Sequence, residues 1–107
     1  MKKDFVISSI ETERFKDQKF SWIYIHAQSP KQDDFDAAAD LALLLRDHSL
    51  CERVVSTGRE LDLEFLCKGF SFRLTFNSIQ GIAIECDYAV TEQVKSMLIP
   101  FCGIRLD

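Results

Sequence analysis

Two histidines, His26 and His48, are the side chains of this 107-residue chain best suited to proton transfer near neutral pH. His26 ends a run of aromatic and β-branched residues, whereas His48 lies near the carboxyl end of a predicted helix, where a positive charge is favourable. No serine stands in a G-x-S-x-G context, and no glycine-rich phosphate loop is present. We therefore expect structural or surface roles for both histidines. The enzymatic alternative is a site in the cleft between the long helix and the sheet that uses His26 and an aspartate.

Four aspartates, Asp33, Asp34, Asp36 and Asp40, form a second candidate site. Asp36 and Asp40 are four residues apart, so a helix places them on one face, where two carboxylates help to hold a hard cation. A cation site needs more oxygen ligands, and the sequence has no EF-hand-type loop to supply them. The cluster fits the amino end of a helix, where negative charge complements the helix dipole, and we expect no metal and no cofactor.

The four cysteines, Cys51, Cys67, Cys86 and Cys102, lie far apart in the sequence. None is within four residues of another, so the short spacings of zinc knuckles and thioredoxin-type motifs are absent. We expect reduced thiols that pack as small buried hydrophobes. The less favoured alternatives are a metal site assembled from distant strands and a reactive thiol, for which the sequence offers no clear activating base.

The formal net charge is −4, and the 13 lysines and arginines are dispersed among acidic residues. Binding to nucleic acid requires clustered cations, so we expect no nucleic-acid partner. The apolar run after Lys2 and Lys3 covers only residues 5–10, which is shorter than the core of a signal peptide. No stretch approaches the roughly 20 apolar residues of a membrane span. We therefore expect a cytoplasmic protein without a membrane partner.

The segment 61–77 carries the strongest structural signal, because one placement of its turn pairs the apolar residues with one another. A two-residue loop at Lys68-Gly69 fixes the register of an antiparallel hairpin. In that register one face is apolar and the other is mostly polar, with Glu64 opposite Arg73. Extension to a strand at residues 82–87 places Glu85 on the other side of Arg73. The apolar pairs are Cys67 with Phe70, Phe65 with Phe72, Leu63 with Leu74, and Leu61 with Phe76.

The remaining elements follow from periodicity and from residues that start or stop helices. Strands are predicted at 4–11, 19–26 and 51–57, and a helix at 30–48 with its start signal at 29–32. Thr91 is expected to cap a second helix, which Pro100 ends or kinks near Ile99. The order ββαβββα predicts a single α+β domain over residues 1–107, with a mainly antiparallel sheet and two helices packed on one face.

The strand at 19–26 has apolar side chains on both faces, unlike the hairpin. Phe20, Trp22, Tyr24 and His26 alternate with two isoleucines. The simplest interpretation is a central strand whose aromatic rings belong to the core, or are covered by the first strand and residues 12–18. The functional interpretation is a contact surface, because tryptophan and tyrosine are enriched at interfaces. We expect a non-enzymatic binding or adaptor module that uses Trp22, Tyr24 and His26 to contact a protein partner or a second copy of itself.

Overall fold

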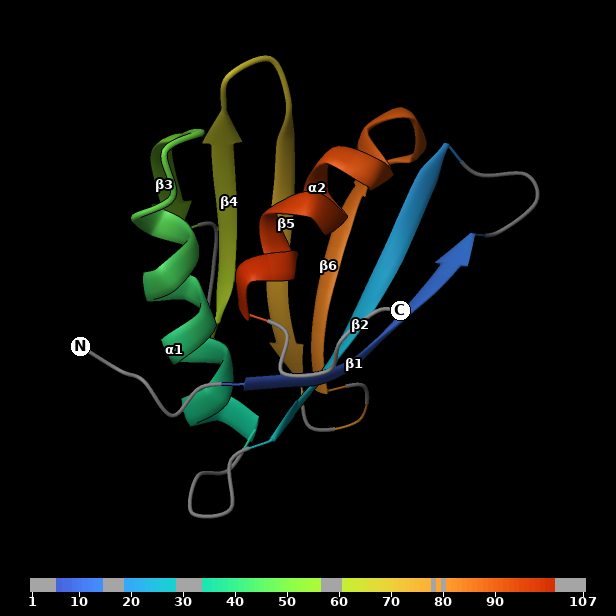
Figure 1. Ribbon diagram of the computed structural model, residues 1–107, viewed down its shortest axis with the longest axis vertical. Helices are drawn as coiled ribbons and strands as arrows, with labels where there is room; N and C mark the ends of the chain where they lie inside the picture. The colour runs from blue at the N-terminus through green and yellow to red at the C-terminus, as the bar shows by residue number, and fades with distance from the viewer. Residues whose placement is uncertain are drawn as a thin grey trace.

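The structure, a computed structural model, describes residues 6–14, 19–28, 34–56, 61–77, 79 and 81–101. These residues form one antiparallel sheet of six strands and two helices, and both helices lie on the same side of the sheet (Figure 1). The α+β class predicted from the sequence and the order ββαβββα are therefore confirmed. The strands are β1 (Val6–Arg14), β2 (Phe20–Gln28), β3 (Cys51–Ser56), β4 (Asp62–Cys67), β5 (Ser71–Asn77) and β6 (Gly81–Asp87). The helices are α1 (Asp34–Arg46) and α2 (Thr91–Leu98), and 3-10 turns occupy η1 (Tyr88–Val90) and η2 (Ile99–Phe101).

The sheet has the strand order β1-β2-β6-β5-β4-β3. The last strand, β6, lies between β2 and β5 and joins the amino-terminal hairpin to the β3–β4–β5 meander (Figure 1). Strands β1 and β3 form the two edges, and each contains a register irregularity, next to Ser8 in β1 and next to Glu52 in β3. Such irregularities twist an edge strand and discourage pairing with another chain.

The predicted hairpin register is confirmed. Phe65 lies opposite Phe72 and Glu64 opposite Arg73, and the N–H of Cys67 donates to the carbonyl of Phe70 at 2.9 Å. The turn needs Gly69, whose φ of 88° lies in the left-handed region that side chains disfavour. The extension to β6 is also confirmed, since Arg73 lies opposite Glu85 and Leu74 opposite Ile84.

The core lies between the sheet and the two helices. Helix α1 contributes Ala38, Leu41 and Leu45, which have exposed fractions of 0%, and α2 contributes its own apolar stripe of Val94, Met97 and Leu98. The face of the sheet that meets these helices is called the inner face. The buried apolar residues that the strands contribute to this core are Ile7, Ile23, Ile25, Phe65, Cys67, Phe72, Leu74, Ile82, Ile84 and Cys86.

The first turn of helix α1 lies at the edge of the core, because Phe35 remains 43% exposed. Its ring meets Phe76 edge-on at 5.8 Å, so it packs at the periphery of the core. The helix ends at Arg46, and the predicted start signal at 29–32 lies outside the described residues. His48 lies in the following turn, where its Nδ1 accepts a hydrogen bond from the Leu50 N–H at 3.1 Å. This histidine therefore organises a turn.

The prediction that Thr91 caps the second helix is wrong. Thr91 is the first residue of α2 and is buried, and no side chain caps the helix. Asp87 instead caps η1, since its Oδ1 accepts from the Ala89 N–H at 2.8 Å. The hydroxyl of Thr91 is hydrogen-bonded to Ser21 Oγ at 2.9 Å, which connects α2 to β2 within the core. The end of the helix at Leu98, before Pro100, agrees with the prediction.

Candidate binding surface on the outer face of the sheet

The face of the sheet opposite α1 and α2 is called the outer face. Along β2, Ile23 and Ile25 are buried on the inner face, so the period-two alternation of a strand directs Trp22, Tyr24 and His26 to the outer face. These three residues are called the aromatic row. The predicted separation of the strand into two apolar faces is therefore correct.

The aromatic row is not part of the core. Trp22 and Tyr24 are half-buried, and His26 is exposed, as is Phe20 at the start of the strand with a fraction of 48%. Strand β2 is the second strand from one edge of the sheet, and β1 pairs beside it instead of covering it. Both described helices lie on the inner face, so within the described part of the chain no element crosses the aromatic row (Figure 1).

Two glutamates of β1 contact the polar ends of the aromatic row. The Tyr24 hydroxyl donates to Glu13 Oε1 at 3.0 Å, and His26 Nε2 lies 2.7 Å from Glu11 Oε1. Burial raises the pKa of Tyr24, and the hydrogen bond and negative charge of Glu13 raise it further, so this hydroxyl remains a donor. The side chains of His26 and Glu11 are 52% and 71% exposed, so their contact is a surface contact.

Carboxylates flank the aromatic row on its other side as well. Glu85 of β6 lies opposite Trp22, and Asp87 lies opposite Phe20. Strands β1, β2 and β6 contain a single lysine or arginine, Arg14. The guanidinium of Arg14 lies 3.5 Å from the centre of the Tyr88 ring. Arg14 pairs with Ser21, which is buried on the inner face, so Arg14 does not belong to the outer face. The outer face of these three strands therefore combines aromatic rings with negative charge.

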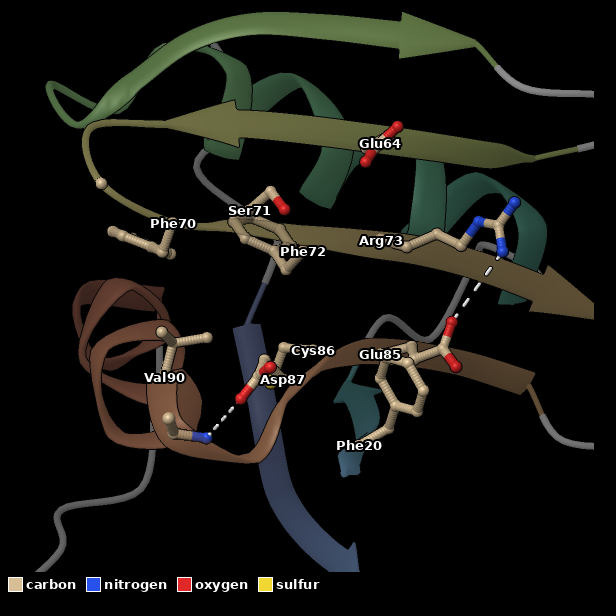
Figure 2. Close-up of a pocket in the computed structure, with 12 residues that line it drawn as sticks. Phe20, Glu64, Phe70, Ser71, Phe72, Arg73, Glu85, Cys86, Asp87 and Val90 are labelled. Atoms are coloured by element: carbon tan, nitrogen blue, oxygen red, sulfur yellow. Dashed lines mark hydrogen bonds and ion pairs between the residues drawn. The ribbon is translucent and has the colours of Figure 1, made fainter. Parts of the chain in front are cut away.

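A shallow hollow of about 700 Å³ lies where β5 and β6 diverge. The pairing of these strands ends at Phe72 and Cys86, and the gap beyond is bounded by the hairpin loop and η1. Figure 2 shows Phe70, Phe72 and Val90 on one part of its wall, with Glu85 and Phe20 at the other end. The hollow thus adjoins the amino-terminal end of the aromatic row.

The hollow does not bring together the residues expected of an acid–base site. His26 does not line it. Among its lining residues, Cys86 has a pKa raised mainly by burial, which disfavours a reactive thiolate. The side chain of His26 belongs to the outer face, on the opposite side of the sheet from α1.

The aspartates of the predicted acidic cluster that the structure describes differ from one another in burial. Asp36 is exposed, Asp40 is buried, and Asp33 lies outside the described residues. Within the described ranges, no group of three or more histidine, cysteine, aspartate and glutamate side chains is placed to hold a metal ion.

Glu11 and Glu13 are the site residues that sequence reasoning missed. Their alternation in the segment 9–13 is visible in the sequence and typical of a solvated strand face. Which side chains lie beside these glutamates depends on the register between β1 and β2. That register is shifted beside Ser8, and no two-residue turn fixes it.

The segments described here contain no helix long and apolar enough to cross a membrane. Comparisons of the chain with protein-family models, curated proteins and solved structures found no match.

Proposed function

We propose that this chain is a non-enzymatic protein-binding module that uses the aromatic row to bind a basic segment of a partner protein. The observation that carries the proposal is the position of Trp22 between Glu13 of β1 and Glu85 of β6, with Tyr24 opposite Glu11. Tryptophan and tyrosine supply large contact areas at low entropic cost, and their ring faces attract lysine and arginine. The flanking carboxylates complement the same cations and speed their approach.

The charge of this surface favours a different protein over a second copy of the chain. A symmetric dimer places the same patch of both copies in contact. Two copies joined through the aromatic row would bring Glu13 and Glu85 toward the glutamates of the other copy. Like charges placed together at an interface are costly, whereas a basic segment removes that cost.

The alternative function, an enzyme with His26 as its acid or base, draws support from one contact. The carboxylate of Glu11 lies 2.7 Å from His26 Nε2 and would orient the imidazole. The pair is mostly exposed and lies apart from the hollow, so it lacks the enclosure that strengthens electrostatic catalysis. The binding function accounts for more features of the outer face, namely its aromatic rings and their flanking carboxylates.

The test exploits the fact that Trp22 is the single tryptophan of the chain. Its fluorescence is titrated with synthetic peptides of equal length that are basic, neutral or acidic and that each carry one apolar residue. We expect the basic peptides to change the emission, with an affinity that falls as salt rises. Equal responses to acidic and basic peptides, or no response to any, would contradict the proposal.

Variants assign the binding to the aromatic row. Tyr24→Ser and Glu13→Lys should each weaken peptide binding at least several-fold while circular dichroism remains unchanged. The double variant Trp22→Ser/Tyr24→Ser is followed by isothermal calorimetry and sedimentation, since it lacks the fluorophore. The matched control, Ile79→Ser/Ile99→Ser, removes two apolar side chains that are 93% and 54% exposed elsewhere, and it should bind normally. A dimer that dissociates in the Trp22/Tyr24 variant would replace the basic partner by a second copy.

A further inference from the structure

Cys51 and Cys67 lie directly opposite each other on β3 and β4. Two hydrogen bonds define the kind of position that they occupy. The N–H of Lys68 donates to the Leu50 carbonyl at 3.0 Å, which makes Leu50 and Lys68 the neighbouring hydrogen-bonded pair. The N–H of Cys67 points away from β3, to the carbonyl of Phe70 just before β5. Cys51 and Cys67 are therefore a non-hydrogen-bonded pair, in which the Cα atoms of facing residues are only about 4.5 Å apart. That separation lies within the range of about 4.4–6.8 Å found across disulfides.

Both side chains are free thiols, and each lies close enough to the other to influence its pKa. The thiol of Cys51 also donates to the Arg53 carbonyl at 3.9 Å. Cys51 is half-buried, so solvent reaches it, whereas Cys67 is buried with an exposed fraction of 7%. One thiol is thus accessible to a reagent, and the other is positioned behind it.

We propose that Cys51 and Cys67 form a thiol–disulfide exchange site whose substrate is a small-molecule disulfide such as oxidised glutathione. The Cys51 thiolate attacks one sulfur of that disulfide, forms a mixed disulfide and releases one thiolate. The Cys67 thiolate then attacks the sulfur of Cys51, closes the Cys51–Cys67 bond and releases the second thiolate. The protein dithiol is oxidised, the small disulfide is reduced to two thiols, and the two protons of the cysteines pass to the released thiolates.

The order of attack follows from access and charge. Burial raises the pKa of both thiols, and that of Cys67 reaches about 11, partly because of the neighbouring Cys51. In the mixed disulfide Cys51 no longer carries a proton or a charge, so it no longer hinders ionisation of Cys67 by repulsion. The exchange is therefore slow at neutral pH and accelerates in alkaline solution, as expected for thiols that are mostly protonated.

The bond would change the edge of the sheet. Strand β3 pairs with β4 alone, and its register is irregular next to Cys51. A bond between Cys51 and Cys67 closes a covalent ring through both strands, and such rings stabilise proteins largely by restricting the unfolded chain. Oxidation would therefore stabilise the pairing of β3 with β4 without any rearrangement of either strand.

The full chain is equilibrated in glutathione buffers of increasing oxidation, trapped by alkylation and digested with trypsin. Because the sequence has arginines at positions 46, 53 and 59 and lysine at 68, the two cysteines fall on separate peptides, 47–53 and 60–68. Mass spectrometry should find these two peptides joined, with the loss of two hydrogen atoms, in a protein without disulfide bonds between chains. Joining of either peptide to the Cys86 peptide, or a persistent glutathione adduct on Cys51, would overturn the proposal.

Variants distinguish a specific pair from general thiol oxidation. Cys86→Ala/Cys102→Ala keeps only the proposed pair and should form the internal bond as the parent does. Cys51→Ser should form none. The urea midpoint should rise on oxidation in the parent and in Cys86→Ala/Cys102→Ala, and should stay constant in Cys51→Ser. A folded parent that forms no bond in the most oxidising buffer, or whose midpoint falls on oxidation, shows that the strand geometry does not accommodate the bond.

Discussion

The rings of Phe65 and Phe72 are stacked across the β4–β5 hairpin, with 4.9 Å between their centroids and an angle of 6° between their planes. Their exposed fractions are 0% and 3%, and both belong to the core shared with the two helices. A facing aromatic pair of this kind contributes both buried area and ring–ring attraction. The hairpin is therefore anchored to the core at its centre, while its loop at Lys68-Gly69 remains exposed.

Truncation of either ring should destabilise the protein severely. Phe65→Ala and Phe72→Ala are each expected to lower the free energy of unfolding by about 3–5 kcal/mol, because each leaves a cavity in a packed core. Urea unfolding measures the loss. The matched control is Phe20→Ala, whose ring is 48% exposed and which should cost far less. Losses below about 1 kcal/mol in both core variants would show that the rings do not support the core.

Arg73 should contribute little to stability despite its two ion pairs. It lies on the outer face between Glu64 and Glu85, as predicted, and its Nε is 2.9 Å from Asp62 Oδ1, a contact that the sequence did not predict. The second pair, from Nη1 to Glu85 Oε1, measures 3.8 Å. Each pair should contribute about 0.2–1 kcal/mol, and less in high salt. Double-mutant cycles of Arg73→Ala with Asp62→Asn and with Glu85→Gln measure both couplings, and the Asp62 coupling should be the larger.

The hydrogen bond between Ser21 and Thr91 should behave as a unit. Both hydroxyls are buried and lie 2.9 Å apart, and the Thr91 hydroxyl donates to the Tyr88 carbonyl at 2.8 Å, which leaves Ser21 as the donor to Thr91. Thr91→Val deprives Ser21 of this partner, so we expect a loss of about 1–3 kcal/mol. The double variant Ser21→Ala/Thr91→Val should lose less than the sum of the two single losses, since it leaves no orphaned hydroxyl. Additive losses in urea unfolding would contradict a shared bond.

The stability of the reduced protein should fall in alkaline solution because of Cys67. Burial, followed by the nearby Cys51 and Glu52, raises the pKa of this thiol from 9.0 to about 11 in the folded state. The folded protein therefore retains a proton that the unfolded chain releases, and the associated stability is present below pH 9.0 and is lost as the pH approaches about 11. Urea midpoints on both sides of this window should fall more in the parent than in Cys67→Ala. Parallel curves would exclude this thiol as a cause.

The sequence by itself determined the hairpin and its extension. The alternation of apolar and polar residues in 61–77 has one register in which both faces are uniform, and the two-residue loop at Lys68-Gly69 enforces it. The same local logic placed Ile23 and Ile25 on one face of β2 and the aromatic row on the other. The local pattern gave the wrong role for Thr91, because a threonine that caps a helix and a buried threonine that forms a hydrogen bond across the core have the same local sequence signal.

Only the tertiary structure decided which distant segments lie side by side. The insertion of β6 between β2 and β5 sets Glu85 beside Trp22, and the β1–β2 register sets Glu11 and Glu13 against the aromatic row. The facing of Cys51 and Cys67 depends in the same way on the β3–β4 register. Alternation along a strand is a local property of the chain, but pairing between strands without a tight turn is chosen by the packing of the whole core against α1 and α2. The face of the sheet on which each candidate side chain lies could therefore be predicted from the sequence, whereas its neighbours on the adjacent strands could not.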